Sequence, residues 1–308
     1  MPVSETKYIW FNGKFIEWNE AKIHVLTHTL HYGSGVFEGI RCYKTPKGPA
    51  IFRLRDHIER LFRSAKAIKI EIPYTIDTLS DAVAETVKVN NLDECYIRPI
   101  VFRGYGEMGL NPLGSPVEVA IAVWPWGAYL GEESLKRGVK VKLSPYTRIP
   151  KKAFPPNVKV TGIYVNSILA KIDAVMDGYD EALMLDENGF IAEGPGENIF
   201  IVKNEVLYTP PDDSTILLGI TRDSIIKIAE NLGYKVEKVN VDKDMLYNAD
   251  EAFFTGTATE VAPICEVDGR RIGDGKPGKL TIKLQQEYLK IVRGENLDYE
   301  FWLTYVNR

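Results

Sequence analysis

Hydrophobic residues recur along the chain with two different spacings, which predict both strands and helices. Residues 8–11 and 15–18 are largely apolar and flank Asn12-Gly13, a dipeptide that favours the tight turn of a β-hairpin. Residues 55–68 and 76–89 instead place apolar side chains every three or four positions, which predicts two amphipathic helices. Further strands are predicted at residues 39–43, 50–52, 95–102 and 117–124.

The pattern changes at residue 124, where Trp124-Pro-Trp-Gly-Ala-Tyr-Leu-Gly131 combines large aromatic residues with proline and glycine, unlike a flexible linker. We therefore expect a small α+β domain at residues 1–123, a packed interdomain segment at 124–136 and a large α/β domain at 137–308. The large domain is predicted to contain a strand at 139–143, a helix at 164–176, hairpins at Asn188-Gly189 and Lys203-Asn204, a helix at 222–232, strands at 234–239 and 252–255, and a final helix at 279–292.

The composition is that of a globular protein, with 45% hydrophobic and 26% charged residues. A formal net charge of -4 argues against nucleic acid as the main partner, and the basic stretch at residues 148–159 contains three prolines, which favours a solvated loop for most of its charges. No apolar run approaches membrane-spanning length, and the first residues lack the apolar core of a signal peptide. Cys42, Cys95 and Cys265 show no metal or disulfide spacing, so a cytoplasmic protein is expected.

The stretch Asn157-Val-Lys-Val-Thr161 places a lysine between two valines. The alternation of a strand would put the amine of Lys159 on the face opposite Val158 and Val160. Taken alone, such a lysine is typical of a solvated surface. Beside an apolar or cationic wall, a lysine instead becomes a neutral nucleophile that can condense with an aldehyde.

Glu193-Gly-Pro-Gly-Glu-Asn198 follows a predicted hairpin and precedes an apolar strand. Its glycines would let the backbone approach a flat ligand closely. Taken alone, the segment favours an ordinary turn with solvated carboxylates. A glycosidase pair would need a second carboxylate, which the sequence does not identify.

Two turns rich in glycine and threonine are candidates for binding an oxyanion. Leu218-Gly-Ile-Thr-Arg222 opens a predicted helix, and Thr255-Gly-Thr-Ala-Thr-Glu260 follows a short strand. A helix N-terminus with a hydroxyl fits a phosphate, although simple capping by Thr221 explains the first turn equally well. A lysine, an acid and two such turns together suit pyridoxal phosphate, which needs an amine, a carboxylate and N–H donors.

His24, His28 and His31 are spaced like metal ligands, which keeps a metal-dependent hydrolase open as an alternative. No cysteine lies nearby, and histidines in a packed, hydrogen-bonded loop explain the spacing as well. A binding protein without catalytic activity is the third class of function considered.

Taken in order, the motifs resemble the class IV pyridoxal-phosphate aminotransferases, most closely the branched-chain amino-acid aminotransferases. The resemblance spans nearly the whole chain. It rests on Tyr8-Ile-Trp-Phe-Asn-Gly13, His31-Tyr-Gly-Ser-Gly-Val-Phe-Glu-Gly-Ile-Arg41, Tyr96-Ile-Arg-Pro99, Trp126-Gly-Ala-Tyr129, Lys159, Glu193 to Phe200, Leu207-Tyr-Thr209, Leu217-Leu-Gly-Ile-Thr-Arg222 and the turn at Thr255. One departure is Pro195, which stands where a small residue is usual and removes a backbone N–H.

The resemblance implies a two-domain fold of the class IV, D-amino-acid aminotransferase-like type, with the active site between the domains. The implied reaction moves the amino group of L-leucine, L-isoleucine or L-valine to 2-oxoglutarate in a ping-pong cycle. Lys159 would bind the cofactor's aldehyde and then carry a proton between the substrate Cα and the cofactor C4′, while Glu193 would pair with the pyridinium nitrogen. The other implied cofactor residues are Arg60, Tyr164, Gly196, Asn198, Leu217, Gly219, Ile220, Thr221, Gly256 and Thr257, and no metal is implied.

For the substrate, the resemblance places Tyr96 with the amides of Thr257 and Ala258 at the α-carboxylate, and Arg98 at the distal carboxylate of glutamate. The remaining implied substrate residues are Phe37, Gly39, Trp126, Tyr129 and Tyr164. Tyr32 and the Gly109-Leu110 loop would reach into the neighbouring subunit's site, which implies at least a homodimer and allows a hexamer of three dimers. A D-amino-acid aminotransferase and an aminodeoxychorismate lyase remain as alternatives, because both share Lys159, Glu193 and the phosphate turns.

Overall fold

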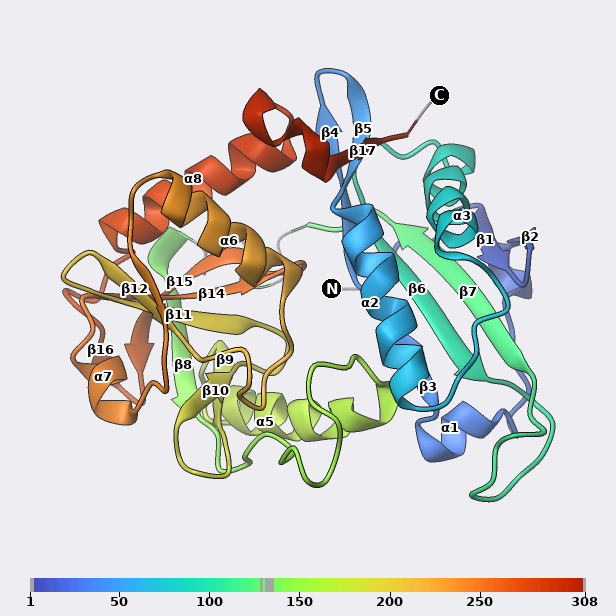
Figure 1. The fold of residues 1–308 in the computed structure, drawn as a ribbon, viewed down its shortest axis with the longest axis horizontal. Helices are drawn as coiled ribbons and strands as arrows, with labels where there is room; N and C mark the ends of the chain where they lie inside the picture. The colour runs from blue at the N-terminus through green and yellow to red at the C-terminus, as the bar shows by residue number, and fades with distance from the viewer. Residues whose placement is uncertain (1–2, 128–129, 131–135, 307–308) are drawn as a thin grey trace. The chain divides into compact units, whose positions relative to one another are not determined.

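A computed structural model describes residues 3–127, 130 and 136–306 (Figure 1). Contacts within the chain divide it into two compact units, each discontinuous in sequence. Unit 1 contains Met1–Gly127, Val158–Ile163 and Lys290–Arg308, and unit 2 contains Ala128–Asn157 and Tyr164–Leu289. No helix of the described residues has both the length and the apolar character needed to cross a membrane.

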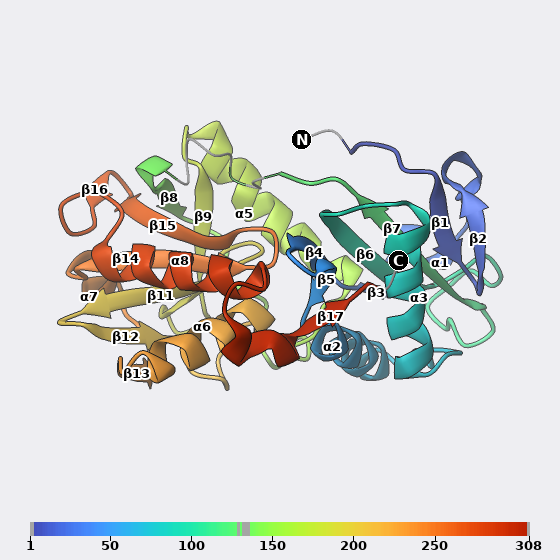
Figure 2. The same cartoon turned by 90° about the horizontal axis from the view of Figure 1, so that it is seen from above.

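Unit 1 is built on an antiparallel sheet with strand order β17-β5-β4-β6-β7-β1-β2, and β3 pairs with β6. The strands are β1 (Tyr8–Phe11), β2 (Lys14–Glu17), β3 (Gly35–Phe37), β4 (Ile40–Thr45), β5 (Gly48–Phe52), β6 (Cys95–Arg103), β7 (Val117–Trp124) and β17 (Leu303–Tyr305). The helices are η1 (Trp18–Glu20), α1 (His28–Tyr32), α2 (Leu54–Ala67), α3 (Ile76–Val89), η2 (Thr161–Ile163) and η3 (Leu297–Trp302). In Figures 1 and 2, α2 and α3 cover the same face of the sheet.

The hairpin predicted at the start of the chain is confirmed, because β1 pairs with β2 through Phe11 and Lys14. Asn12 and Gly13 both take positive φ, 48° and 90°, which is the backbone that a two-residue hairpin turn requires. The two predicted amphipathic helices are also confirmed as α2 and α3, and each buries its apolar stripe on the sheet.

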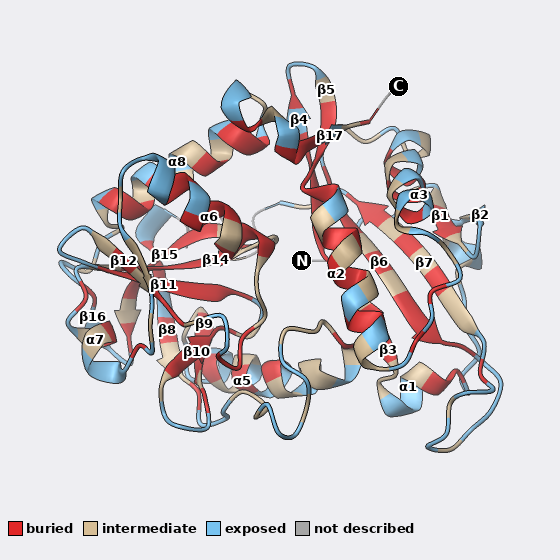
Figure 3. Cartoon of the chain, in the orientation of Figure 1, coloured by how far each residue is buried: buried red, intermediate tan, exposed pale blue. Residues whose placement is uncertain are grey.

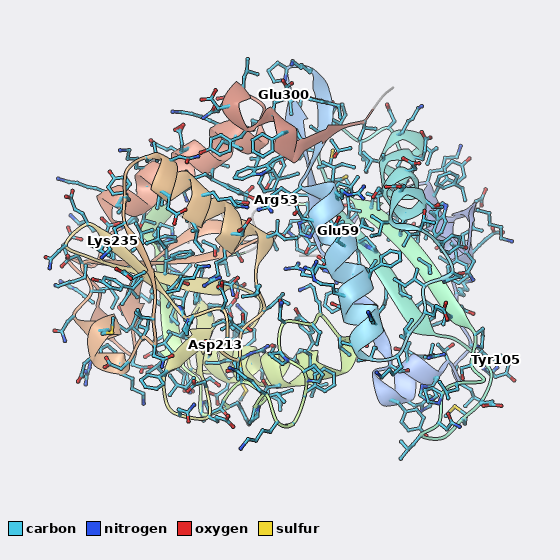
Figure 4. All side chains as sticks on the ribbon, viewed as in Figure 1. Arg53, Glu59, Tyr105, Asp213, Lys235 and Glu300 are labelled. Carbon is cyan, nitrogen blue, oxygen red and sulfur yellow. The ribbon has the colours of Figure 1, made fainter. Side chains whose placement is uncertain are left out.

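The end of the chain returns to unit 1. Leu303 pairs with Phe52, and the backbone N–H of Arg53 donates to the carbonyl of Trp302 at 2.7 Å; Figure 4 labels Arg53 next to α2. Residues 158–163 also belong to this unit, since Val160 forms a bridge with Val36. The units therefore differ from the continuous ranges expected above, because pairing between segments far apart in sequence leaves no mark on the local hydrophobic pattern.

Unit 2 contains a mixed sheet with strand order β10-β9-β8-β15-β14-β11-β12-β13, and β16 pairs with β15. Its strands are β8 (Val139–Leu143), β9 (Glu181–Leu185), β10 (Ile191–Glu193), β11 (Asn198–Lys203), β12 (Val206–Thr209), β13 (Val236–Lys238), β14 (Glu251–Gly256), β15 (Glu260–Val267) and β16 (Arg270–Arg271). Its helices are α5 (Tyr164–Met176), α6 (Ile220–Asn231), α7 (Lys243–Tyr247) and α8 (Lys279–Val292), whose last three residues belong to unit 1. Both views place α5 and α6 on opposite sides of β11 and β14 (Figure 2).

The strands of unit 2 close into a ring, because β10 pairs with both β9 and β11. The register that closes the ring opposes Glu193 and Asn198. The hairpins expected at Asn188-Gly189 and Lys203-Asn204 connect the paired strands β9 and β10, and β11 and β12. The helix α6 begins at Ile220, two residues before the predicted start, since Gly219 rather than Thr221 is its N-cap residue.

Buried residues are concentrated in the strands of both units (Figure 3). In unit 2, Phe200 on β11 and Phe253 on β14 lie opposite each other, with ring centroids 5.1 Å apart and planes at 7°. Both rings are fully buried. This stacked pair joins two neighbouring strands of the ring in the core.

We expect Phe253→Ala to lower the free energy of unfolding by about 3–5 kcal/mol, because it leaves a cavity beside Phe200. Phe301→Ala is the matched control; Phe301 is 76% exposed, so its truncation should change stability by less than about 0.5 kcal/mol. Urea titrations followed by circular dichroism measure both. Similar losses for the two variants would contradict the placement of Phe253 in the core.

Candidate active site

Lys159 is held in unit 1 by its backbone. Its N–H donates to the hydroxyl of Ser64 on α2 at 3.0 Å, and its carbonyl accepts from the N–H of Phe37 at 3.1 Å. Its Nζ lies 4.8 Å from the ring centroid of Phe37. The strand alternation considered for residues 157–161 does not occur, because only an isolated bridge forms at Val160. Contacts with α2 and β3 hold the lysine instead.

A second cation faces the same aromatic ring. The guanidinium carbon of Arg98 lies 4.8 Å from the ring centroid of Phe37 and 5.3 Å from that of Tyr96. Nη2 of Arg98 is 3.5 Å from the Tyr96 hydroxyl, and within the described ranges Arg98 forms no ion pair. The ring of Trp126 packs 5.0 Å from that of Tyr96. Within the described part of unit 1, Arg98 thus has no carboxylate partner. It lies beside the rings of Phe37, Tyr96 and Trp126, which we call the aromatic wall.

Gly39 makes room for this arrangement. A Cβ atom at residue 39 would lie 2.0 Å from the hydroxyl oxygen of Tyr96, so only glycine allows the tyrosine to take this position. Phe37, Gly39, Tyr96, Arg98 and Trp126 are therefore brought together in unit 1, as the resemblance implied. Tyr129, expected in the same wall, lies outside the described residues.

Arg60 is buried and paired. Its Nε and Nη2 donate to the two carboxylate oxygens of Glu38 at 2.6 and 2.8 Å, and Glu38 also accepts from Nδ1 of His57 at 2.8 Å. Burial alone would raise the pKa of Glu38, but the charge and hydrogen bonds of Arg60, together with the hydrogen bond from His57, hold it far below its ordinary value. Burial lowers the pKa of His57, so this ring is neutral at pH 7. Sequence reasoning missed Glu38 and His57, because neither stands in a pattern that signals its partner.

In unit 2, the carboxylate of Glu193 is buried and receives donors from three segments. Oε2 accepts from the side-chain amide of Asn198 at 3.0 Å and from the backbone N–H of Leu217 at 3.0 Å. Oε1 lies 3.0 Å from Nη2 of Arg148. Most charges of the basic stretch at residues 148–159 are expected to be solvated, and no sequence pattern predicts this contact of Arg148.

The N-terminus of α6 lies beside this carboxylate. Asn198 also donates to the carbonyl of Leu217 at 2.8 Å, and a Cβ at Gly219 would lie 2.0 Å from Oδ1 of Asn198. The N-cap residue Gly219 offers no side-chain acceptor to the first N–H groups of α6, and Thr221 is buried in the first turn. The helix end therefore has the donors and the dipole that suit an anion.

The second Gly/Thr turn, residues 255–260, contacts the segment that follows Glu193. Thr257 and Ala258 lie in the tight turn between β14 and β15, where Gly256 pairs with Glu260. The hydroxyl of Thr259 donates to Oε1 of Glu197 at 3.0 Å, and a Cβ at Gly256 would approach the carbonyl of Gly196 to 3.3 Å. The structure thus brings Glu193, Gly196, Asn198, Leu217, Gly219 and Gly256 together in unit 2.

Pro195 occupies the two-residue connection between Gly194 and Glu197, whose backbones are joined by an N–H to carbonyl bond of 2.8 Å. Proline suits the first central position of a type I or type II turn, because its fixed negative φ matches the backbone needed there. The departure from the family pattern therefore leaves the local turn intact.

The three histidines have hydrogen-bond partners of their own. His28 bonds to the Ser34 hydroxyl at 2.6 Å and to the carbonyl of Gly109 at 2.8 Å, so it anchors the loop that carries Leu110. His31 donates to the carbonyl of Val25, and His24 accepts from the N–H of Leu26. Among residues 3–127, 130 and 136–306, no three His, Cys, Asp or Glu side chains gather as metal ligands would. A packed loop accounts for their spacing.

Comparison with known proteins connects this geometry to a family. The family model described as amino-transferase class IV matches residues 35–267. A branched-chain-amino-acid aminotransferase of Pseudomonas aeruginosa is 50% identical over 298 residues, 97% of each chain. A solved branched-chain amino acid aminotransferase of T.th. with pyridoxamine 5′-phosphate has a TM-score of 0.95 at 50% identity, covering 98% of this chain and 99% of its own. The same enzyme with N-(5′-phosphopyridoxyl)-L-glutamate has a TM-score of 0.94 at 48% identity, with the same coverage.

The chain belongs to the class IV aminotransferases, and it has their mixed α/β fold. Within that class it falls among the branched-chain-amino-acid aminotransferases. As a member of this family it is a pyridoxal-phosphate-dependent transaminase, so the resemblance and the cofactor expected from the sequence are confirmed. None of these relatives favours the D-amino-acid aminotransferase, the lyase or the metal hydrolase.

The residues present fit the cofactor. The amine of Lys159, the buried carboxylate of Glu193 and the glycine-capped start of α6 are the kinds of group that pyridoxal phosphate requires. Tyr164 begins α5 in unit 2, while Arg60 lies in unit 1. Which of these residues touch the cofactor stays a prediction.

Glu38→Gln should lower the free energy of unfolding by about 3–5 kcal/mol at pH 7, because it leaves the charge of Arg60 buried without its anion. The folded-state pKa of Glu38 lies below its ordinary value of 4.5, so its contribution is complete above pH 4.5 and is lost as the pH falls toward the lowered pKa. The difference between wild type and variant should therefore shrink in acid.

Urea midpoints from pH 7 down to pH 3 measure this difference. Glu85→Gln is the control, because Glu85 forms an exposed pair with Lys88 on α3 and should contribute little. A deficit of Glu38→Gln that stays constant across this range would contradict the assignment.

Proposed function

We propose that the enzyme transfers the amino group of L-leucine, L-isoleucine or L-valine to 2-oxoglutarate in two half-reactions of a ping-pong cycle. The observation that carries the proposal is Arg98, stacked on Phe37 and Tyr96 and without an ion pair in the described part of the chain. Phe37 is also the ring beside the amine of Lys159. A substrate side chain at this wall meets aromatic carbon and one guanidinium, so the same wall suits an aliphatic group or a carboxylate.

The residues divide the chemistry between them. When bound, pyridoxal phosphate delocalises the charge left on the substrate Cα and stores the amino group between the half-reactions. Lys159 would hold the cofactor through its amine and would carry the proton between the substrate Cα and the cofactor C4′. Glu193 would accept from the ring nitrogen, and Tyr164 would donate to the ring oxygen. The phosphate ligands are Arg60, Ile220, Thr221 and Thr257, and the backbone and side chains of Gly196, Asn198, Leu217, Gly219 and Gly256 shape the surrounding turns.

Substrate recognition uses separate groups for the two ends of the substrate. The hydroxyl of Tyr96 and the amides of Thr257 and Ala258 bind the α-carboxylate. Arg98 binds the distal carboxylate of glutamate, and Phe37, Trp126 and Tyr129 contact aliphatic side chains. This division explains how one site accepts both an acidic and an apolar substrate.

The smallest assembly we propose is a homodimer. In unit 2, α5 exposes an apolar face on which each residue is 43% to 80% exposed: Val165, Ile168, Leu169, Ile172, Val175 and Met176. In unit 1, Tyr32 and Leu110 are exposed large apolar residues, and Leu110 is 89% exposed. Apolar patches of this kind mark interfaces, and a second copy of the chain would cover them.

The three cysteines are buried free thiols, which fits the reducing cytoplasm that we propose for the protein.

Lys159→Ala should abolish turnover, because it removes the amine that condenses with the cofactor. Borohydride reduction should then no longer attach the cofactor covalently to the enzyme. Peptide mapping of the reduced wild type should place the adduct on residue 159. Lys151→Ala, in the same basic stretch, is the control and should trap normally. An adduct on another lysine would refute the assignment.

Arg98→Met should lower kcat/KM for glutamate and 2-oxoglutarate by about ten- to a hundred-fold, because a hydrogen bond to a charged group contributes roughly 1.5–3 kcal/mol. Leucine should change much less, since it gains only apolar contact at this wall. Steady-state assays with both substrates measure the ratio.

Arg103→Met on the same strand is the matched control, because Arg103 donates to the carbonyl of Lys69 at 2.6 Å, away from Phe37. It should leave the ratio of glutamate to leucine activity unchanged. Equal losses for both substrates in Arg98→Met would place Arg98 at the shared α-carboxylate instead.

Ile172→Lys should weaken the dimer at least about tenfold, because a buried isoleucine contributes roughly 1.5–3 kcal/mol. Light scattering coupled to size exclusion across a dilution series measures the mass. Phe301→Lys, which alters another exposed apolar residue, should keep the dimer. A dimeric Ile172→Lys at low micromolar concentration would remove α5 from the interface.

A further inference from the structure

Arg148 is fixed at both ends. Its backbone N–H donates to the carbonyl of Leu185 on β9 at 2.8 Å. Its Nη1 donates to the hydroxyl of Ser167 on α5 at 3.1 Å, and its Nη2 lies 3.0 Å from Oε1 of Glu193 on β10. Arg148, in the loop after β8, therefore connects β9, β10 and α5 next to the carboxylate of Glu193.

This ion pair is largely shielded from water. The side chain of Arg148 is 13% exposed and that of Glu193 is 6% exposed. Nε of Arg148 is buried and has no hydrogen-bond partner in the described residues. Removing two charges from water offsets much of their attraction, so a buried pair of this kind is weak evidence for a purely stabilising role.

We propose that Arg148 is a positioning residue that keeps Glu193 ionised and correctly oriented for the ring nitrogen of the cofactor. The proposal rests on the role given to Glu193 above. An adjacent cation favours the charged form of a carboxylate, and an ionised carboxylate is an acceptor only. Arg148 thus ensures that the proton between Glu193 and the ring belongs to the ring nitrogen.

The other donors to Glu193 cannot replace this charge. The side-chain amide of Asn198 and the N–H of Leu217 are neutral and bind the other oxygen, Oε2. The neighbouring acid, Glu197, is turned to different partners, because its oxygens accept from Thr259 and from the N–H of Gly196. Loss of Arg148 would leave the neutral donors Asn198 and Leu217 in place and remove the cation beside Oε1 of Glu193.

A double-mutant cycle tests whether Arg148 acts through Glu193. The variants are Arg148→Met, Glu193→Gln, the double variant and Arg137→Met, a control that breaks an ion pair with Asp180 at the surface of the same unit. The readouts are the absorption spectrum of the bound cofactor, the dissociation constant of pyridoxal phosphate from the apo-enzyme, and kcat and KM for leucine.

Arg148→Met alone should lower kcat about ten- to a hundred-fold, the loss expected for a hydrogen bond to a charged group, with KM for leucine changed less than about threefold. Its spectrum should shift in the same direction as that of Glu193→Gln, and its affinity for pyridoxal phosphate should fall. In the Glu193→Gln background the same substitution should change each readout by less than about threefold. Arg148→Lys should restore part of the loss, and Arg137→Met should behave like wild type.

Equal fold-losses from Arg148→Met in both backgrounds would overturn the proposal, as would an unchanged spectrum and affinity in the single variant. If Glu193→Gln alone resembles wild type, the role of Glu193 fails, which is a different result from missing coupling. Should Arg148→Met not fold, Ser167→Ala provides the milder test, because it removes the second anchor of the guanidinium. It should lower kcat about two- to fivefold in wild type and not in Glu193→Gln, and no change in wild type would overturn the proposal.

Discussion

The carboxylate of Glu193 is buried, and a buried charge must be held by fixed partners. Its partners come from Arg148, Asn198 and Leu217, which are separated in sequence and meet where β10 and β11 close the ring of strands. Much of the local sequence follows from this one requirement. The side chain of Asn198 excludes any Cβ at Gly219, and that glycine leaves the start of α6 without a side-chain cap.

Two arginines of unit 1, Arg60 and Arg98, are held in place by different kinds of contact. Arg60 is bound through both carboxylate oxygens of Glu38, which His57 supports, so its orientation is set within the fold. Arg98 is stacked on two rings and lacks a carboxylate within the described ranges. A stacked guanidinium keeps its fork of donors available in a defined plane. In the proposed reaction, the distal carboxylate of glutamate would be the partner of Arg98.

Lys159 depends on contacts that cross long stretches of sequence. The bridge between Val160 and Val36 and the bond from Lys159 to Ser64 assign residues 158–163 to unit 1, although the residues on both sides belong to unit 2. The lysine backbone is therefore tied to β3 and α2, and Phe37 on β3 presents its ring to both Lys159 and Arg98. One short strand, β3, therefore sets the positions of Lys159 and Arg98 relative to each other.

The sequence determined by itself whatever depends on neighbouring residues or on motifs in a fixed order. The Asn12-Gly13 hairpin, the helices α2, α3, α5 and α8, the family and its cofactor could all be predicted, because turn chemistry, hydrophobic period and motif order are local or linear properties. Only the tertiary structure decided the return of β17 to unit 1, the isolated bridge in place of a strand at Lys159, the burial of Glu38 and His57, and the pairing of Arg148. A charged residue in a loop has the same local sequence whether water or a carboxylate is its partner. The partner of Arg148 lies 45 positions away, and only the folded chain brings the two charges together.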